Sequence, residues 1–158
     1  MDGPRERNAR VLRECFAAIS AGDVDRLVAH YTSDYELELP YRSPHETFSI
    51  RGRDEVRAYL ARAFERVELG LVVTAEYPAA DPDLIVAEYR AEGRLRASGS
   101  PYRNRYVGFW WFREGRVCRT REYYDPVAAA AALSAPEVGG ATGPGTAVAG
   151  SARDEERR

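Results

Sequence analysis

Hydrophobic positions in the first part of the chain follow the spacing of helices. A stripe of residues three or four positions apart runs through residues 4–21 and consists of Val11, Leu12, Cys15, Phe16 and Ile19. This spacing predicts an amphipathic helix, which Gly22 would end and after which Asp23 would cap a second, shorter helix. The buried face of the second helix would consist of Val24, Leu27, Val28 and Tyr31. A third helix is predicted from Gly52 onward, with a hydrophobic face made of Val56, Tyr59, Leu60, Ala63 and Phe64.

Other segments alternate between hydrophobic and polar residues, which is typical of strands with one covered face. The clearest case is residues 34–41, whose hydrophobic positions are Tyr35, Leu37, Leu39 and Tyr41. Further strands are expected at residues 48–51, 69–77, 84–95, 103–113 and 116–124, and a short helix at residues 126–133. Glu114 and Gly115 between the last two strands are typical of a hairpin turn.

This order of elements predicts an α+β fold. Three helices of the N-terminal half would pack on the concave face of a strongly curved antiparallel sheet, which would form a cone-shaped barrel around a conical space. Residues 4–133 would form one domain, and residues 134–158, which are rich in Ala, Gly and Pro, would be a disordered tail.

The last strand carries the most informative residue, Glu122. Residues 117, 119, 121 and 123 share one face of this strand, and residues 118, 120, 122 and 124 share the other. Because Arg119 and Arg121 belong in solvent, Glu122 is expected on the covered face. A buried carboxylate is costly unless it is paired, so two alternatives stay open: a salt bridge to an arginine that reaches inward, or a general acid or base whose pKa is raised by burial.

The same alternation predicts which side chains line the cone. The inward set is Tyr35, Leu37, Leu39, Tyr41, Tyr59, Ile85, Ala87, Tyr89, Asn104, Tyr106, Gly108, Trp110, Thr120, Glu122 and Tyr124. Each tyrosine alone is typical of a core, but so many hydroxyl-bearing rings together favour a pocket for a ring-bearing, partly polar molecule. For residues 103–113 the opposite face, with Val107, Phe109 and Trp111, is also apolar, so either face could point inward. His45 lies in a Pro-containing loop, either as a surface residue or as a proton shuttle, and Asp125 before Pro126 is expected to cap the last helix.

The composition of the chain indicates which partners and which cellular location to expect. The chain has 158 residues, 44% of them hydrophobic, a formal net charge of −2 and a pI near 5.8. Acidic and basic residues are interleaved, so neither nucleic acid nor a membrane is expected as a partner. Residues 1–10 are polar and unlike a secretory signal, and Cys15 and Cys118 occupy apolar positions. These features predict a cytoplasmic protein with reduced core thiols.

The basic residues and histidines exclude further chemistry. All 23 basic residues are arginine, which excludes mechanisms that need a lysine Schiff base. The only histidines, His30 and His45, have no partner histidine at metal-ligand spacing, so neither a metal nor another cofactor is expected.

Three stretches of the sequence resemble the SnoaL-like branch of the nuclear-transport-factor-two-like superfamily: residues 20–27, 51–56 and 121–126. The resemblance covers roughly residues 8 to 133. Within the superfamily the chain is most similar to the phenazine-pathway condensation proteins, at residues 50–54, at Tyr102 and Asn104, and at residues 115–123. This resemblance implies that the acidic catalytic residue of the family corresponds to Glu122. It also implies that Tyr59 occupies the position where the family has a histidine.

Residues and resemblance together lead to a functional hypothesis. The protein would be a cofactor-independent enzyme of secondary metabolism, an isomerase, cyclase or condensation enzyme for an aromatic or polyketide-like substrate. Glu122 and Tyr59 would be catalytic, and the substrate would contact Tyr41, His45, Tyr89, Asn104, Tyr106, Trp110 and Tyr124. The alternative is a non-catalytic carrier or protein-interaction subunit with the same fold. A homodimer is expected in both cases, because helices on one face leave the aromatic outer face of the sheet to be covered.

Overall fold

The computed structural model describes residues 3–42 and 44–134 of the chain. The helices are α1 (Pro4–Ala21), α2 (Val24–Val28), α3 (Arg53–Arg66) and α4 (Pro126–Leu133). The strands are β1 (Tyr31–Leu39), β2 (Phe48–Arg51), β3 (Val67–Pro78), β4 (Leu84–Leu95), β5 (Pro101–Arg113) and β6 (Arg116–Tyr124). The predicted tail, residues 134–158, lies outside the described residues except for Ser134, which caps α4.

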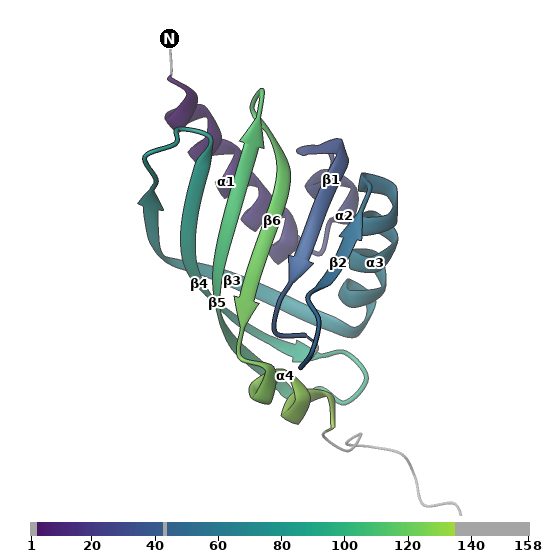
Figure 1. Cartoon of the computed structure of the whole chain (residues 1–158). Helices are drawn as coiled ribbons and strands as arrows, with labels where there is room; N and C mark the ends of the chain where they lie inside the picture. Colours follow the sequence, from purple (N-terminus) through teal and green to yellow (C-terminus); the bar gives the residue numbers. More distant parts are fainter. Residues whose placement is uncertain (1–2, 43, 135–158) are drawn as a thin grey trace, which may run out of the picture.

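The predicted α+β fold is confirmed, with two corrections to the sheet. The six strands lie in the order β2-β1-β6-β5-β4-β3, so the sheet is curved but open, with β2 and β3 as its edges rather than closed into a barrel. All neighbours pair antiparallel except β1 and β6, which pair parallel, so the sheet is mixed. Figure 1 shows these two strands side by side although residues 40–115 separate them in the sequence. Their relative direction depends on the path of the intervening chain, which local alternation does not record.

The helices of the N-terminal half cover one face of this sheet, as predicted. Helix α1 packs on β3 and α3 packs on β1 (Figure 1). Phe16 of α1 places its ring 4.8 Å from that of Tyr89 and 5.5 Å from that of Trp110, centroid to centroid. Gly22 ends α1 in the left-handed conformation, and the Asp23 side chain accepts a hydrogen bond from the Arg26 backbone. No helix in the described part of the chain is long and apolar enough to cross a bilayer.

Strand β1 begins and ends earlier than predicted. Tyr31, expected on the second helix, belongs to β1, where its ring stacks on that of Tyr35 at 3.9 Å. The strand ends at Leu39 because Pro40 has no backbone N–H with which to continue the ladder. Tyr41 is therefore in a turn, 57% exposed, and does not face the cone.

The predicted inward direction of Cys118 is wrong, because β6 contains a bulge at this residue. Val117 lies opposite Phe112 and Arg119 lies opposite Trp111, so Cys118 is an extra residue between the two pairs. Val117, expected to face outward, is completely buried, whereas Cys118 is only partly buried and contacts the backbone oxygen of Trp111. Both cysteines are free thiols. Beyond the bulge, the predicted alternation holds.

The open question about β5 is decided by burial. Asn104 and Trp110 are buried on the helix-covered side, as the first alternative predicted. Phe109 and Trp111 lie on the other side, where the Arg119 guanidinium sits 4.8 Å from the centre of the Trp111 ring. One face of the sheet thus supplies the interior of the cone, and the other is an aromatic outer face.

Candidate active site

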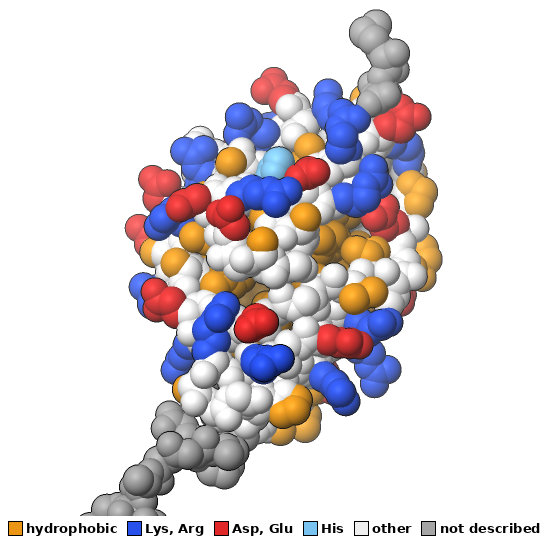
Figure 2. All heavy atoms as spheres, turned by 180° about the vertical axis from the view of Figure 1, so that it is seen from behind, with side chains coloured by type: hydrophobic (Ala, Val, Ile, Leu, Met, Phe, Trp, Pro, Cys, Tyr) orange, Lys and Arg blue, Asp and Glu red, His pale blue; other side chains and the backbone are white. Residues whose placement is uncertain are grey.

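A cavity of about 530 Å³ lies between the sheet and the helices. Its volume is within the range typical of sites that hold small molecules. Aliphatic and aromatic side chains make up most of its lining, and its charged residues are Arg42, Arg62, Arg66 and Glu122. Seen from behind the view of Figure 1, hydrophobic side chains are visible among charged side chains of both signs (Figure 2).

Glu122 lines this cavity and is held by a tyrosine from another strand. It lies opposite Gly108 of β5, which in turn lies opposite Ala87 of β4. The hydroxyl of Tyr89, also on β4, reaches across β5 and donates a hydrogen bond to the Glu122 carboxyl group. Gly108 makes this reach possible, because a Cβ atom there would lie 2.7 Å from the Tyr89 hydroxyl oxygen. A Cβ atom at position 108 would also lie 2.6 Å from Nε1 of Trp110. This Nε1 atom has no hydrogen-bond partner among the described residues.

The environment of Glu122 brings its pKa close to neutrality. Burial in this apolar surround raises the pKa of Glu122 to about 7, while the hydrogen bond from Tyr89 acts in the opposite direction and is the smaller effect. No arginine of the described residues forms an ion pair with Glu122, and no cation is among the causes of its pKa shift. Of the two alternatives for this carboxyl group, the geometry fits the unpaired acid. Both protonation states are populated near neutral pH, which suits a group that must take and return a proton.

Further tyrosines extend from this pair along the sheet. The Tyr106 ring stacks on the Tyr89 ring at 5.2 Å, and its hydroxyl lies 2.9 Å from that of Tyr102. Burial raises the pKa of both Tyr89 and Tyr106, so each remains a neutral phenol that can donate a proton in a hydrogen bond. Tyr106, Trp110 and Tyr124 all line the cavity, as the alternation predicted.

Tyr59 lines the cavity from α3 and is paired with an arginine that the sequence did not single out. Nη1 of Arg42 donates a hydrogen bond of 2.7 Å to the Tyr59 hydroxyl. The Arg42 guanidinium also lies 3.9 Å from the centre of the Phe48 ring. Arg42 follows β1 in a turn, where no periodic pattern indicates which way a side chain points, so no sequence signal distinguished it from other surface arginines.

Three predicted site residues lie away from the cavity. Tyr41 is exposed and packs against Tyr123, with ring centres 5.1 Å apart. His45 is exposed in the loop before β2 and does not line the cavity. Asn104 is buried, but its side chain holds the backbone of Asp125 through two hydrogen bonds of 3.0 Å. Asn104 thereby positions the start of α4, which Asp125 caps as predicted.

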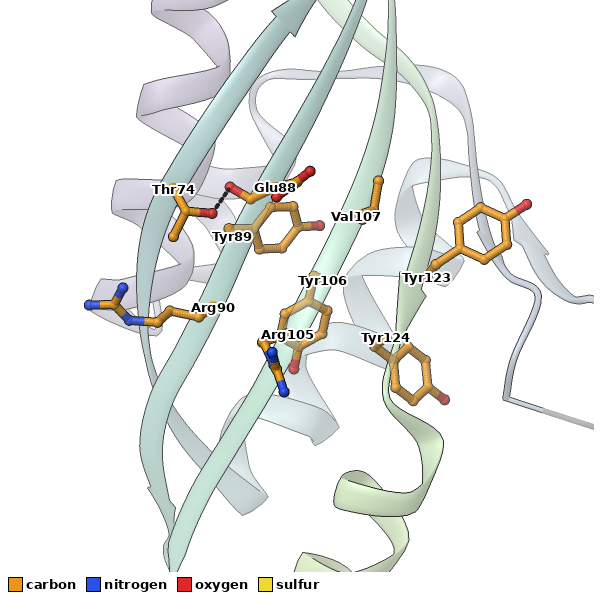
Figure 3. A pocket seen from close by; sticks show the side chains of 9 residues that line it. All are labelled: Thr74, Glu88, Tyr89, Arg90, Arg105, Tyr106, Val107, Tyr123 and Tyr124. Atoms are coloured by element: carbon orange, nitrogen blue, oxygen red, sulfur yellow. Dashed lines mark hydrogen bonds between the residues drawn. The ribbon is translucent and has the colours of Figure 1, made fainter.

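A second recess, of about 440 Å³, lies on the outer face of the sheet (Figure 3). Its lining includes Thr74 of β3 and the outer-face residues Glu88, Arg90, Arg105, Val107 and Tyr123. It also includes Tyr89, Tyr106 and Tyr124, which line the inner cavity as well. Glu122 does not line it. Of these two hollows, only the inner cavity is lined by Glu122, so the candidate site is assigned to the inner cavity.

Comparison with known proteins agrees with the fold and with the predicted resemblance. A PhzA/B-like protein of Pseudomonas aeruginosa, itself uncharacterized, is 27% identical over 101 residues, which cover 64% of this chain and 72% of that protein. A crystal structure from Bacillus subtilis, provisionally named an isomerase, has a TM-score of 0.78 at 23% identity and covers 84% of this chain and 96% of that one. A structure from Xanthomonas campestris, provisionally named a polyketide cyclase, has a TM-score of 0.70 at 23% identity and covers 84% and 100%. Residues 12–120, more than half of the sequence, match the family model described as SnoaL-like domain, and the chain belongs to this family.

Proposed function

We propose that the protein is a cofactor-independent enzyme that moves a proton on a ring-bearing small molecule, with Glu122 as the general acid and base. The observation that carries this proposal is a cavity-lining carboxyl group with a pKa of about 7 and a phenol, rather than a cation, as its partner. A merely structural acid would be expected to pair with one of the many arginines. The names of related structures, isomerase and polyketide cyclase, support the same class of substrate and reaction.

The proposed chemical step uses groups that already face the cavity. Ionised Glu122 takes a proton from a carbon or hydroxyl of the substrate, and the negative charge that develops on a substrate oxygen is stabilised by hydrogen-bond donors. Tyr124 would be one such donor, because it lines the cavity and burial raises its pKa, so that its hydroxyl keeps its proton. Glu122 then returns the proton at another position. Isomerisation, ring closure and condensation in secondary metabolism share this step and differ in the substrate bond that forms or breaks.

The pKa of Glu122 in solution tests the proposal, and Tyr89→Phe sharpens the test. We expect a wild-type value near 7 by NMR titration of labelled carboxyl carbons, with Glu122→Gln identifying the signal. The Tyr89→Phe variant should raise the pKa further, because it removes the hydrogen bond that favours the ionised form. Tyr106→Phe is the matched control, since the Tyr106 hydroxyl bonds to Tyr102 and not to Glu122. A wild-type pKa below the ordinary value of 4.5 would mean a hidden cation partner and would favour a non-catalytic carrier.

We also propose that the outer face of the sheet forms a homodimer interface. An aromatic outer patch consists of Tyr41, Phe109, Trp111 and Tyr123, whose neighbouring ring centres lie 5.1 to 6.2 Å apart. Beside it, Glu38 is buried between Arg119 and Arg121, with oxygen–nitrogen distances of 2.6 Å to each. An ordered aromatic patch of this kind is typical of an interface rather than of a surface in water.

Light scattering tests the dimer directly. The wild type should show twice the chain mass of 17.7 kDa, and Phe109→Asp should shift the mass to that of one chain, because it places a charge within the aromatic outer patch. Val127→Asp is the control, since Val127 is 75% exposed on α4. A wild-type mass of a single chain at micromolar concentration would overturn the proposal.

A further inference from the structure

The charges around the cavity are unequal in sign and in position. Its lining contains three arginines, Arg42, Arg62 and Arg66, and all three are exposed. Glu122, the acidic residue among the described lining residues, lies on the sheet and is partly buried. With Glu122 half protonated near neutral pH, the entrance carries a clear excess of positive charge. Such a field attracts an anion into the cavity.

Arg42 differs from the arginines of this protein that are paired with a carboxylate. Arg26, Arg51, Arg57 and Arg121 each lie within 3.0 Å of a carboxylate oxygen. Arg42 makes no ion pair with any acidic residue in the described ranges 3–42 and 44–134. The Tyr59 hydroxyl and the face of the Phe48 ring hold its guanidinium in place instead. Contacts of this kind orient the group without neutralising its charge.

Tyr59 adds a second donor at the same point. Because its oxygen already accepts from Arg42 at 2.7 Å, its O–H is directed to another acceptor. Burial raises the pKa of Tyr59, so the hydroxyl keeps its proton, and the opposing effect of Arg42 is smaller. The remaining guanidinium N–H groups and this O–H together match the two oxygens of a carboxylate.

We propose that Arg42 and Tyr59 form an anion subsite at the entrance, and that the substrate is a ring-bearing carboxylic acid. Its carboxylate would bind Arg42 and Tyr59, and its ring would lie against Tyr106 and Trp110, which places the reacting atoms near Glu122. The inference rests on the proposed function, because it names what the same cavity would hold.

A matched pair of probes tests the subsite without any need for turnover. The probes are 2-naphthoate and 2-naphthamide, which share a ring system and differ in charge, and binding is measured by isothermal titration calorimetry. The wild type should bind the naphthoate roughly tenfold more tightly, as expected for a charge-assisted pair that is partly exposed to solvent. This preference should shrink as salt is added. Equal affinity for the two probes, or no saturable binding of the naphthoate, would overturn the proposal.

Variants separate the subsite from the catalytic acid. Arg42→Gln should abolish the preference for the naphthoate while leaving naphthamide binding within about twofold, and Arg42→Lys should keep part of the preference. Arg13→Gln, on an exposed position of α1, is the control and should change neither affinity. Glu122→Gln should keep the preference, so failure of the subsite and failure of the proposed acid–base role give different results. A preference that survives in Arg42→Gln would place the anion elsewhere.

Discussion

Replacing Glu122 by glutamine is expected to slow proton abstraction from a ring substrate by about 10²–10⁴-fold, the usual contribution of a general base. A suitable probe is 5-nitrobenzisoxazole, from which a base removes the ring C–H proton while the N–O bond breaks to give a coloured cyanophenolate. The reaction needs only a carboxylate in an apolar cavity that accepts a flat ring. Glutamine keeps the shape of Glu122 and an acceptor for the Tyr89 hydroxyl but has no basic form near neutral pH.

The pH dependence of the same reaction gives an independent check. The wild-type rate should rise with pH and level off above about 7, because the ionised form of Glu122 is the base. Glu65→Gln, on an exposed position of α3, is the control and should behave as the wild type. If Glu122→Gln retained the wild-type rate and pH profile, the acid–base role of Glu122 would be wrong, whatever the affinity of the cavity for small molecules.

The same substitution is expected to stabilise the fold above neutral pH. The pKa of Glu122 is raised from 4.5 to about 7 on folding, so the folded protein holds a proton that the unfolded chain releases in that range. Stability contributed by Glu122 is therefore present below pH 4.5 and is lost as pH rises through about 7. Above pH 7 the loss amounts to at most about 3 kcal/mol, from 1.36 kcal/mol for each pKa unit.

Urea unfolding at two pH values measures this effect. At pH 8 Glu122→Gln should have the larger free energy of unfolding, by up to about 3 kcal/mol, and near pH 5 the difference should almost vanish. The control Glu65→Gln should show no such pH-dependent gain. A variant that is less stable than the wild type at pH 8 would show that ionised Glu122 is stabilised by a partner in the folded protein. Together with a loss of proton transfer, the expected gain would show that Glu122 is kept for chemistry at a cost in stability.

Alternation along single strands was enough to predict much of the candidate site. Because successive side chains of a strand point to opposite faces, the positions of the arginines in β6 implied that Glu122 faces inward. Alternation likewise predicted that Tyr89, Tyr106, Trp110 and Tyr124 lie on the cavity side, and in the structure all four line the cavity. These are local properties of the chain, which hold wherever the strand ends up in the fold.

Alternation does not predict side-chain direction where the regularity of a strand is interrupted. Pro40 ends β1 before Tyr41, so the expected inward direction of Tyr41 does not apply. One extra residue in β6 turns Cys118 outward and Val117 inward. A bulge depends on how two strands pair, and neither strand alone indicates it.

By itself, the sequence determined the α+β class, the helix ends at Gly22 and Asp23, and the inward face of the strand that carries Glu122. Only the tertiary structure decided that β1 and β6 run parallel, that Tyr89 reaches Glu122 across Gly108, and that Arg42 meets Tyr59 at the entrance. The physical reason is that these contacts join residues that are far apart in the sequence. Periodicity reports which way a side chain points from its own element, whereas hydrogen bonds, burial and pKa depend on which elements are brought together.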